Sequence, residues 1–150
     1  MAGWKSVEEI DAYCLAVELR DDIGRLTASG RASKDFEFRD QIRESAASAT
    51  KNLSEGFDRY FHGEFGYFAG VAKGSLGETI DALKEGRAKG YWSISEFDRL
   101  MALAERARKA TGGLLRHLLT SQAPGEAALK KKSPRRKKHH RPANRERTQT

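Results

Sequence analysis

Residues 38–57 read FRDQIRESAASATKNLSEGF, and their apolar side chains recur at the spacing of one face of an α-helix. That face consists of Phe38, Ile42, Ala46, Ala49 and Leu53. The pattern predicts a helix from about Asp35 to Glu55, ended by Gly56. A helix with one apolar stripe is stabilised mainly by packing, so this segment requires other helices against which the stripe is buried.

An N-terminal segment before this stretch also has helical periodicity, whereas strand-like alternation is almost absent from the sequence. Ser6 and Glu9 have the spacing of a capping box, so the helix is expected to begin there. Its predicted apolar face is Val7, Ile10, Cys14 and Val17. The helix is expected to end near Gly30, because glycine readily adopts the positive φ common after a helix.

Two further helices are predicted after residue 60. One runs from about Gly63 to Lys89, with an inward face of Phe65, Phe68, Ala72, Leu76, Ala82 and Leu83. The other follows a second capping box, formed by Ser93 and Glu96. Four helices with short connections predict an all-α fold, an antiparallel up-down four-helix bundle.

Charge divides the chain into two parts. The whole chain carries a net charge of +7, and residues 124–150 carry +8, which leaves −1 for residues 1–123. The last 27 residues also contain all three prolines and little that could form a core. We therefore expect a bundle domain over 1–123 and a disordered, Lys/Arg-rich C-terminal tail over 124–150.

The tail carries the strongest binding signal in the sequence. Clustered cations bind the phosphates of nucleic acids by releasing counterions, without sequence specificity. The candidate nucleic-acid-binding residues are Lys130, Lys131, Lys132, Arg135, Arg136, Lys137, Lys138 and Arg141. Two alternatives remain open, a tail that only solubilises the protein and a nuclear-localisation sequence.

Compartment signals are few. The single cysteine, Cys14, allows no intramolecular disulfide and is expected to be a buried, small apolar residue. The N-terminal residues lack the apolar stretch of a secretory signal, and no apolar run approaches the length of a membrane span. A cytoplasmic protein without a membrane partner is the expectation.

The segment 52–68, NLSEGFDRYFHGEFGYF, combines aromatic side chains with Asn52, Glu55 and His62. It resembles either an active site or a structural corner between two helices. No nucleophile with an oriented base and no metal-ligand spacing accompanies these residues. We therefore expect no enzyme, cofactor or metal site, and interpret Asn52 and Glu55 as a hydrogen-bonded pair that stabilises the corner or a subunit contact.

Small residues mark two helix faces. Gln41, Ser45, Ser48, Asn52 and Glu55 form a polar strip beside the apolar stripe, and Gly66, Gly70, Gly74 and Gly77 share one side of the next helix. Each glycine within a helix costs about 1 kcal/mol relative to alanine. Close approach of another helix, within the chain or across a subunit boundary, is the interpretation that would offset this cost.

The order and spacing of these motifs resemble the bacterial 23S rRNA intervening-sequence family, also called the S23 ribosomal protein family. The resemblance covers roughly Ile10 to Thr120. The residues that carry it, and that are taken as structural or interface residues, include Arg43, Ser45, Asn52, Glu55, Gly56, Gly70, Gly74, Ser75 and Glu78. The motif also includes Glu64, Phe65 and Leu76.

The family is similar to the accessory protein of diversity-generating retroelements, which assists a reverse transcriptase. The resemblance implies a non-enzymatic homo-oligomer, a five-subunit ring, acting on RNA, DNA or a nucleoprotein partner such as a reverse transcriptase. That accessory protein is strongly basic on its bundle, whereas residues 1–123 here carry −1. Two functions follow as expectations: an RNA-associated scaffold that binds through its tail, or a protein-interaction module whose tail only solubilises.

Overall fold

The computed structural model describes residues 3–59 and 61–121, and this part of the chain is helical with no strand. Four long helices are accompanied by two short ones. In chain order the elements are η1 (Val7–Glu9), α1 (Asp11–Leu26), α2 (Gly30–Lys34), α3 (Phe36–Phe57), α4 (His62–Ala88) and α5 (Ile94–Thr120).

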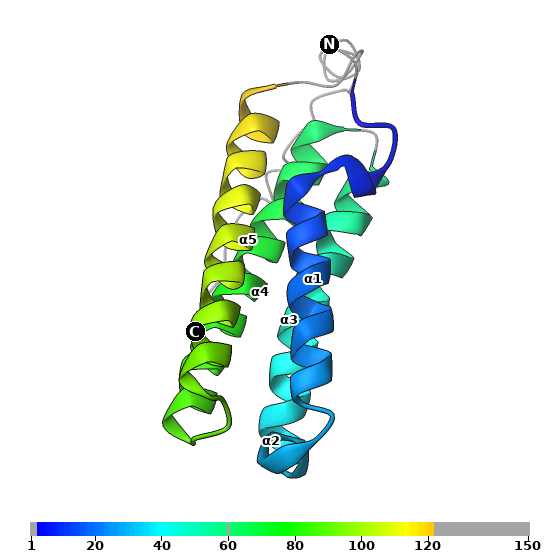
Figure 1. Ribbon diagram of the computed structural model, residues 1–150. Coiled ribbons are helices and arrows are strands. Elements are labelled where there is room, and N and C mark those ends of the chain that lie inside the picture. Colours follow the sequence, from blue (N-terminus) through cyan, green and yellow to red (C-terminus); the bar gives the residue numbers. More distant parts are fainter. Residues whose placement is uncertain (1–2, 60, 122–150) are drawn as a thin grey trace, which may run out of the picture.

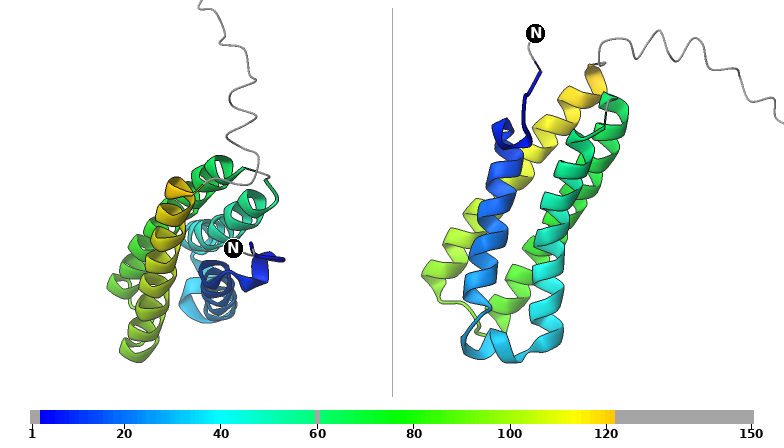
Figure 2. Two further views of the ribbon diagram at one scale, coloured as in Figure 1. Left: turned by 90° about the horizontal axis from the view of Figure 1, so that it is seen from above. Right: turned by 90° about the vertical axis from the view of Figure 1, so that its right-hand side faces the viewer.

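The long helices form the predicted antiparallel up-down four-helix bundle (Figure 1). Helix α3 packs against α1 and α4, and α5 completes the arrangement by packing against α4 and α1. The short helix α2 reverses the chain between α1 and α3 at one end of the bundle. The N-terminal segment, the α3–α4 connection and the end of α5 lie together at the other end (Figures 1 and 2).

The predicted apolar stripe of α3 is confirmed in full as part of the core. Its five members, Phe38, Ile42, Ala46, Ala49 and Leu53, are all buried. They meet Leu76 and Leu83 of α4 and Leu100 and Ala104 of α5 in one continuous cluster. Alanine is frequent in this core, which allows the helices to lie close together.

The predicted start of the first helix is wrong. The Ser6 side chain makes no capping bond, and the Glu9 carboxylate accepts a hydrogen bond from the Lys5 backbone N–H at 2.8 Å. A single 3₁₀ turn, η1, ends at Glu9, and the extended backbone of Ile10 separates it from α1. The chain is not helical at Ile10. A helical spacing that spans Ile10 therefore does not predict which residues on its two sides share one face.

Ile10 is buried as predicted, but the interruption there rotates the buried face of α1 away from the predicted Cys14 and Val17. The buried apolar residues of α1 are Ala12, Ala16, Leu19 and Ile23. Cys14, predicted to be buried, is exposed, and its thiol donates to the Glu8 carbonyl oxygen at a Sγ–O distance of 3.1 Å. The prediction of a core cysteine is therefore corrected.

The two connections at the α2 end contain the positive-φ glycines of the described residues. Gly30 has a φ of 71°, as the sequence predicted, although it begins the short helix α2 rather than only ending α1. Gly90 has a φ of 74° between α4 and α5. Both values lie in the left-handed region that glycine adopts without a steric cost.

The second predicted capping box is confirmed. The Ser93 hydroxyl accepts a hydrogen bond from the Glu96 backbone N–H at 3.0 Å, and the Glu96 carboxylate accepts from the Ser93 N–H at 3.0 Å. The bond from the Ser93 backbone N–H, followed by the interaction of the carboxylate with the Ser93 side chain, lowers the pKa of Glu96 below its ordinary value. The box explains why α5 begins at Ile94.

Within the described ranges, every helix is too short or too polar to cross a membrane. The predicted tail, residues 124–150, lies outside the described residues, as does the boundary predicted after residue 123.

Candidate functional site

The sequence predicted that Gly56 ends the helix. Gly56 instead lies buried in the last turn of α3. A Cβ placed there would lie 2.5 Å from Phe65 Cδ2 and 2.9 Å from Phe68 Cβ, both on α4. Such distances are far shorter than ordinary van der Waals contact, so only glycine fits. Gly56 therefore sets the close approach of α3 and α4 at their connection, and the aromatic segment is a structural corner.

Asn52 and Glu55 do not form the predicted hydrogen-bonded pair. The Asn52 amide donates to the Ser48 carbonyl oxygen at 2.8 Å and to the Ser48 hydroxyl at 3.2 Å. The Glu55 side chain is exposed and accepts from Arg59, one turn later, at 2.6 Å. Asn52 and Glu55 are three residues apart and therefore lie close together on the helix surface. Each nevertheless bonds a residue one turn away, Ser48 for Asn52 and Arg59 for Glu55.

The serines of the polar strip face α4 within the same chain. Ser45 and Thr79 hydroxyl oxygens are 2.9 Å apart, and Ser48 and Ser75 hydroxyl oxygens are also 2.9 Å apart. Every buried side-chain nitrogen and oxygen of the described residues has a hydrogen-bond partner. Ser45 and Ser75 are thus structural residues of the α3–α4 contact, whereas Glu78 is exposed on the outer surface of α4.

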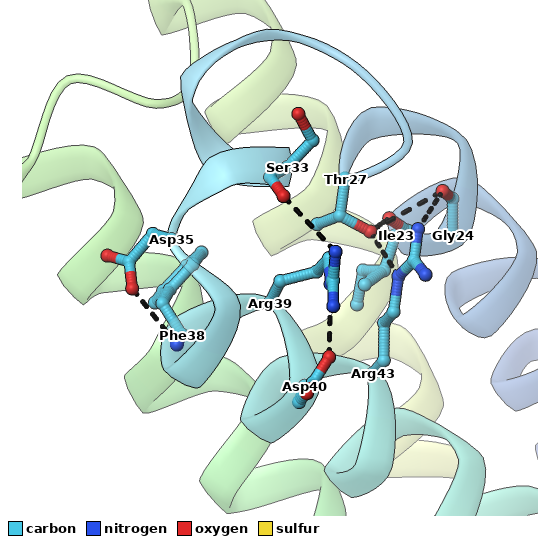
Figure 3. Close-up of polar contacts among 9 residues, drawn as sticks. All are labelled: Ile23, Gly24, Thr27, Ser33, Asp35, Phe38, Arg39, Asp40 and Arg43. Carbon is cyan, nitrogen blue, oxygen red and sulfur yellow. Dashed lines mark hydrogen bonds and ion pairs between the residues drawn. The ribbon is translucent and has the colours of Figure 1, made fainter.

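Arg43 joins α3 to the end of α1 (Figure 3). Its Nε donates to the Thr27 hydroxyl at 2.7 Å, and its Nη2 donates to the Gly24 carbonyl oxygen at 3.1 Å. Thr27 is fully buried and donates its own proton to the Ile23 carbonyl oxygen at 2.6 Å. The predicted structural role of Arg43 therefore has a clear basis in these contacts.

The glycine side of α4 is mostly open within the chain. A Cβ at Gly70, Gly74 or Gly77 would meet nothing within 4 Å, and one at Gly66 would meet Leu119 at 3.4 Å. Close approach of another helix of the same chain is therefore the wrong explanation for Gly70, Gly74 and Gly77. The alternative, a contact across a subunit boundary, stays a prediction.

The two histidines of the bundle lie near each other at the end where α5 stops. His62 Nδ1 is 3.0 Å from the Ser121 hydroxyl oxygen, and the His62 and His117 ring centroids are 6.4 Å apart. His117 also meets the Trp4 ring edge to face, with centroids 5.7 Å apart. Over residues 3–59 and 61–121 no group of three or more His, Cys, Asp or Glu side chains is placed to hold a metal ion.

A polar cluster that no sequence pattern predicted lies at the α2 end of the bundle. The Asp35 carboxylate accepts from the Tyr91 hydroxyl at 2.6 Å and from Lys89 at 3.3 Å. The Tyr91 bond, followed by the bond from the Phe38 N–H, lowers the pKa of Asp35, and the same Tyr91 bond raises the pKa of the phenol. Bonds to Glu85 and Asp35 raise the pKa of Lys89. Contacts between residues more than 50 positions apart leave no local pattern in a sequence.

The cations predicted to bind nucleic acid all belong to the tail, so they lie outside the described residues. They are Lys130, Lys131, Lys132, Arg135, Arg136, Lys137, Lys138 and Arg141.

Comparison with known proteins agrees with the resemblance carried by the motifs. A family model described as 23S rRNA-intervening sequence protein matches residues 8–113, from the 3₁₀ turn to the last third of α5. No curated protein matches the sequence. The matched region contains Arg43, Gly56 and the serines of the α3–α4 contact. The chain belongs to the family of 23S rRNA-intervening sequence proteins.

Proposed function

We propose that this protein is a non-enzymatic, oligomeric scaffold associated with RNA or another nucleic acid, and that its C-terminal tail is the binding element. The observation that carries the proposal is the separation of charge, with +8 on residues 124–150 and −1 on residues 1–123. The family description names 23S rRNA, which favours RNA as the nucleic acid and the cytoplasm as the compartment.

The chemistry of binding is electrostatic. Each cation that neutralises a phosphate releases a condensed counterion, so affinity falls steeply as the salt concentration rises. The tail contains 10 Lys and Arg and only two acidic residues, Glu126 and Glu146. Such contacts carry no base specificity by themselves, because they engage only the phosphate backbone.

Oligomerisation would strengthen these weak contacts. Tyr67, Gly70, Val71 and Gly74 form one outward face of α4, defined here as the glycine face, where Tyr67 is 70% and Val71 37% exposed. An aromatic side chain beside open backbone is suited to contact a second copy of the chain. Several tails on one assembly would then bind a single RNA with avidity, and the resemblance implies a ring of five.

The proposal is tested in the full chain by comparing two sets of four substitutions. One set replaces Arg135, Arg136, Lys137 and Lys138 of the tail by glutamine. The other set replaces Arg106, Arg108, Lys109 and Arg116 by glutamine. These four residues are exposed on α5 and form no ion pair among the described residues. Affinity for a generic single-stranded RNA is measured at two salt concentrations.

The tail set should weaken binding strongly. It should also reduce the steepness of log affinity against log salt concentration by about three, because each of the four lost phosphate contacts contributes roughly 0.7 on a single strand. The α5 set should have a much smaller effect. Equal losses from both sets would show that general charge, not the tail, governs binding. An unchanged slope for the tail set would remove the proposed function.

A protein-interaction module is the second candidate, including an accessory subunit of a reverse transcriptase. The exposed apolar residues of the glycine face favour it, because a nearly neutral bundle is better suited to a protein than to a polyanion. A specific protein partner that remains bound after the four tail substitutions, and is lost on Tyr67→Asp, would support this candidate instead.

A further inference from the structure

An open hollow lies between α1 and α3, away from the corner and the glycine face. Its volume is about 560 Å³, and it is lined by Arg20, Asp21, Gly24, Arg25, Ala28, Arg43 and Ala47. Three arginine side chains thus border an open depression, together with one aspartate, one glycine and two alanines.

Arg43 is held in one position without being neutralised. Both of its hydrogen bonds, to the Thr27 hydroxyl and the Gly24 carbonyl oxygen, are to uncharged acceptors. No carboxylate of the described residues pairs with it. A guanidinium has five N–H donors, so three remain for a ligand after these two bonds.

Arg39, one turn earlier on α3, is the natural comparison (Figure 3). Its Nε donates to the Asp40 carboxylate at 3.0 Å, and its Nη1 donates to the Ser33 carbonyl oxygen at 3.2 Å. Asp40 therefore neutralises Arg39, which does not line the hollow. Arg39 and Arg43 lie one turn apart on the same helix, but only Arg39 has a carboxylate partner.

The other two arginines of the hollow keep donors available. Arg20 bonds its neighbour Asp21 at 3.0 Å, and Arg25 bonds the buried carboxylate of Asp22, which also accepts from Arg99 at 2.6 Å. Asp22 is 5% exposed and does not line the hollow. Arg20 and Arg25 thus each have a carboxylate partner, and Arg43 is the arginine of the hollow that has none among the described residues.

The other residues that line the hollow, apart from Asp21, are small. A Cβ at Gly24 would meet nothing within 4 Å, and Ala28 and Ala47 contribute only methyl groups. Small groups at the base of an arginine-lined depression leave room for an oxygen-bearing group to contact several guanidinium N–H donors at once.

We propose that this hollow binds a phosphate group, with Arg43 as the fixed donor and Arg20 and Arg25 as the flanking ones. Guanidinium groups match phosphate because two N–H donors engage two oxygens in parallel, and charge-assisted bonds of this kind are the strong ones. The phosphate group can belong to a small molecule or to the backbone of a nucleic acid.

The site is independent of the proposed function. The hollow lies toward the α2 end of α1, whereas α5 ends at the opposite end of the bundle (Figures 1 and 2). Loss of tail binding would therefore leave the hollow intact.

The test uses nuclear magnetic resonance of the full chain labelled with ¹⁵N. Backbone amide signals of Gly24, Ala28 and Ala47 and the Arg43 Nε signal are followed as inorganic phosphate, AMP or a short single-stranded RNA is added. Sodium chloride at equal ionic strength is the control for screening. Each titration is repeated with the four tail residues 135–138 replaced by glutamine, which separates hollow binding from tail binding.

We expect saturable shifts with inorganic phosphate and AMP, absent with chloride and unchanged by the tail substitutions. Arg43→Gln should lower the association constant about tenfold or more, because one charged hydrogen-bonding partner is lost. Arg39→Gln should leave it unchanged. Arg20→Gln should also weaken binding. The Arg20 side chain is half-exposed and bonds Asp21, not Thr27 or the Gly24 carbonyl, so this variant separates loss of binding from a folding defect of the Arg43 variant.

Shifts with RNA in the tail variant, in addition to those with AMP, would assign the site to nucleic-acid backbone; shifts with AMP and phosphate alone would assign it to small phosphates. Absence of saturable shifts at the hollow with all three probes would overturn the proposal. Equal effects of Arg43→Gln and Arg39→Gln would overturn it as well.

Discussion

The ring of Phe65 on α4 lies directly against the backbone of Gly56 on α3, where an added Cβ would stand 2.5 Å from Phe65 Cδ2. Phe65 is buried and also meets Phe57 edge to face, with ring centroids 6.4 Å apart. This contact determines how closely the two helices approach at their connection.

Gly56→Ala should therefore destabilise the protein, although alanine is the better helix former by about 1 kcal/mol. Overpacking against a buried ring costs typically about 1–3 kcal/mol, so after the gain in helix propensity a net loss of up to about 2 kcal/mol is expected in chemical unfolding. Gly24→Ala is the matched control, because its Cβ would meet nothing and it should stabilise α1 by up to about 1 kcal/mol. Equal stability of the two variants would contradict the close-contact interpretation.

Gly74→Leu should reduce self-association if the glycine face meets another copy. A leucine on this face would keep the helix intact, because Gly74 is exposed and nothing in the chain lies within 4 Å of its Cβ position. Light scattering across a dilution series should show a smaller mass than for the unmodified chain. Glu105→Leu, also exposed but on α5, should not change the mass. A monomeric unmodified chain at micromolar concentration would exclude the assembly.

Asn52→Ala and Glu55→Ala should now differ, although the sequence predicted one joint effect. Asn52 is partly buried and donates to the Ser48 carbonyl at 2.8 Å, so its removal should cost about 0.5–1.5 kcal/mol. Glu55 has 52% of its side chain exposed and pairs only with Arg59, so its removal should cost at most about 0.5 kcal/mol. Urea unfolding of both variants measures the difference, and the reverse order would restore the predicted role of Glu55.

Ser45→Ala and Thr79→Val should be coupled across the α3–α4 contact. Their hydroxyl oxygens are 2.9 Å apart, and each hydroxyl also bonds a carbonyl of its own helix, Ile42 and Ser75 respectively. Neither single substitution leaves an unsatisfied hydroxyl, so a coupling energy of only about 0.5–1 kcal/mol is expected in a double-mutant cycle. A coupling indistinguishable from zero would show that the contact is only steric.

Stability should depend on pH through the Asp35 cluster. The folded pKa of Asp35 is below its ordinary value of 3.8, so the ionised carboxylate stabilises the fold above that pH. The contribution is lost as the pH falls through the folded pKa. The pKa of Tyr91 is raised above 10.0 and that of Lys89 above 10.5, so their contribution is present below those values and is lost as the pH rises through the folded ones.

Asp35→Asn should flatten the acid side of the pH–stability curve, measured as unfolding midpoints between pH 2 and 6. Tyr91→Phe should shift the same acid transition upward, because the bond that most lowers the pKa of Asp35 is removed. Asp40→Asn is the control, since Asp40 is an exposed partner of Arg39. The same acid dependence in all three variants would contradict the role of the cluster.

The buried face of α3 was predicted accurately because the helix is continuous from Phe36 to Phe57. The five apolar residues of its stripe therefore lie on one side of the helix. The first helix was predicted less well because Ile10 is extended, and the residues on its two sides do not share a helical phase. Gly56 was interpreted as a helix end, because a glycine suited to a turn and a glycine required by a close contact look the same in a sequence.

By itself, the sequence determined the helical class, the number of long helices and the concentration of positive charge in residues 124–150, because these are local properties of periodicity and composition. Only the tertiary structure decided that Gly56 meets Phe65, that Ser45 meets Thr79, and that Arg43 reaches Thr27 without a carboxylate partner. The physical reason is that these contacts depend on how each helix is rotated about its axis. That rotation is set by the packing of all four helices together and not by any one segment.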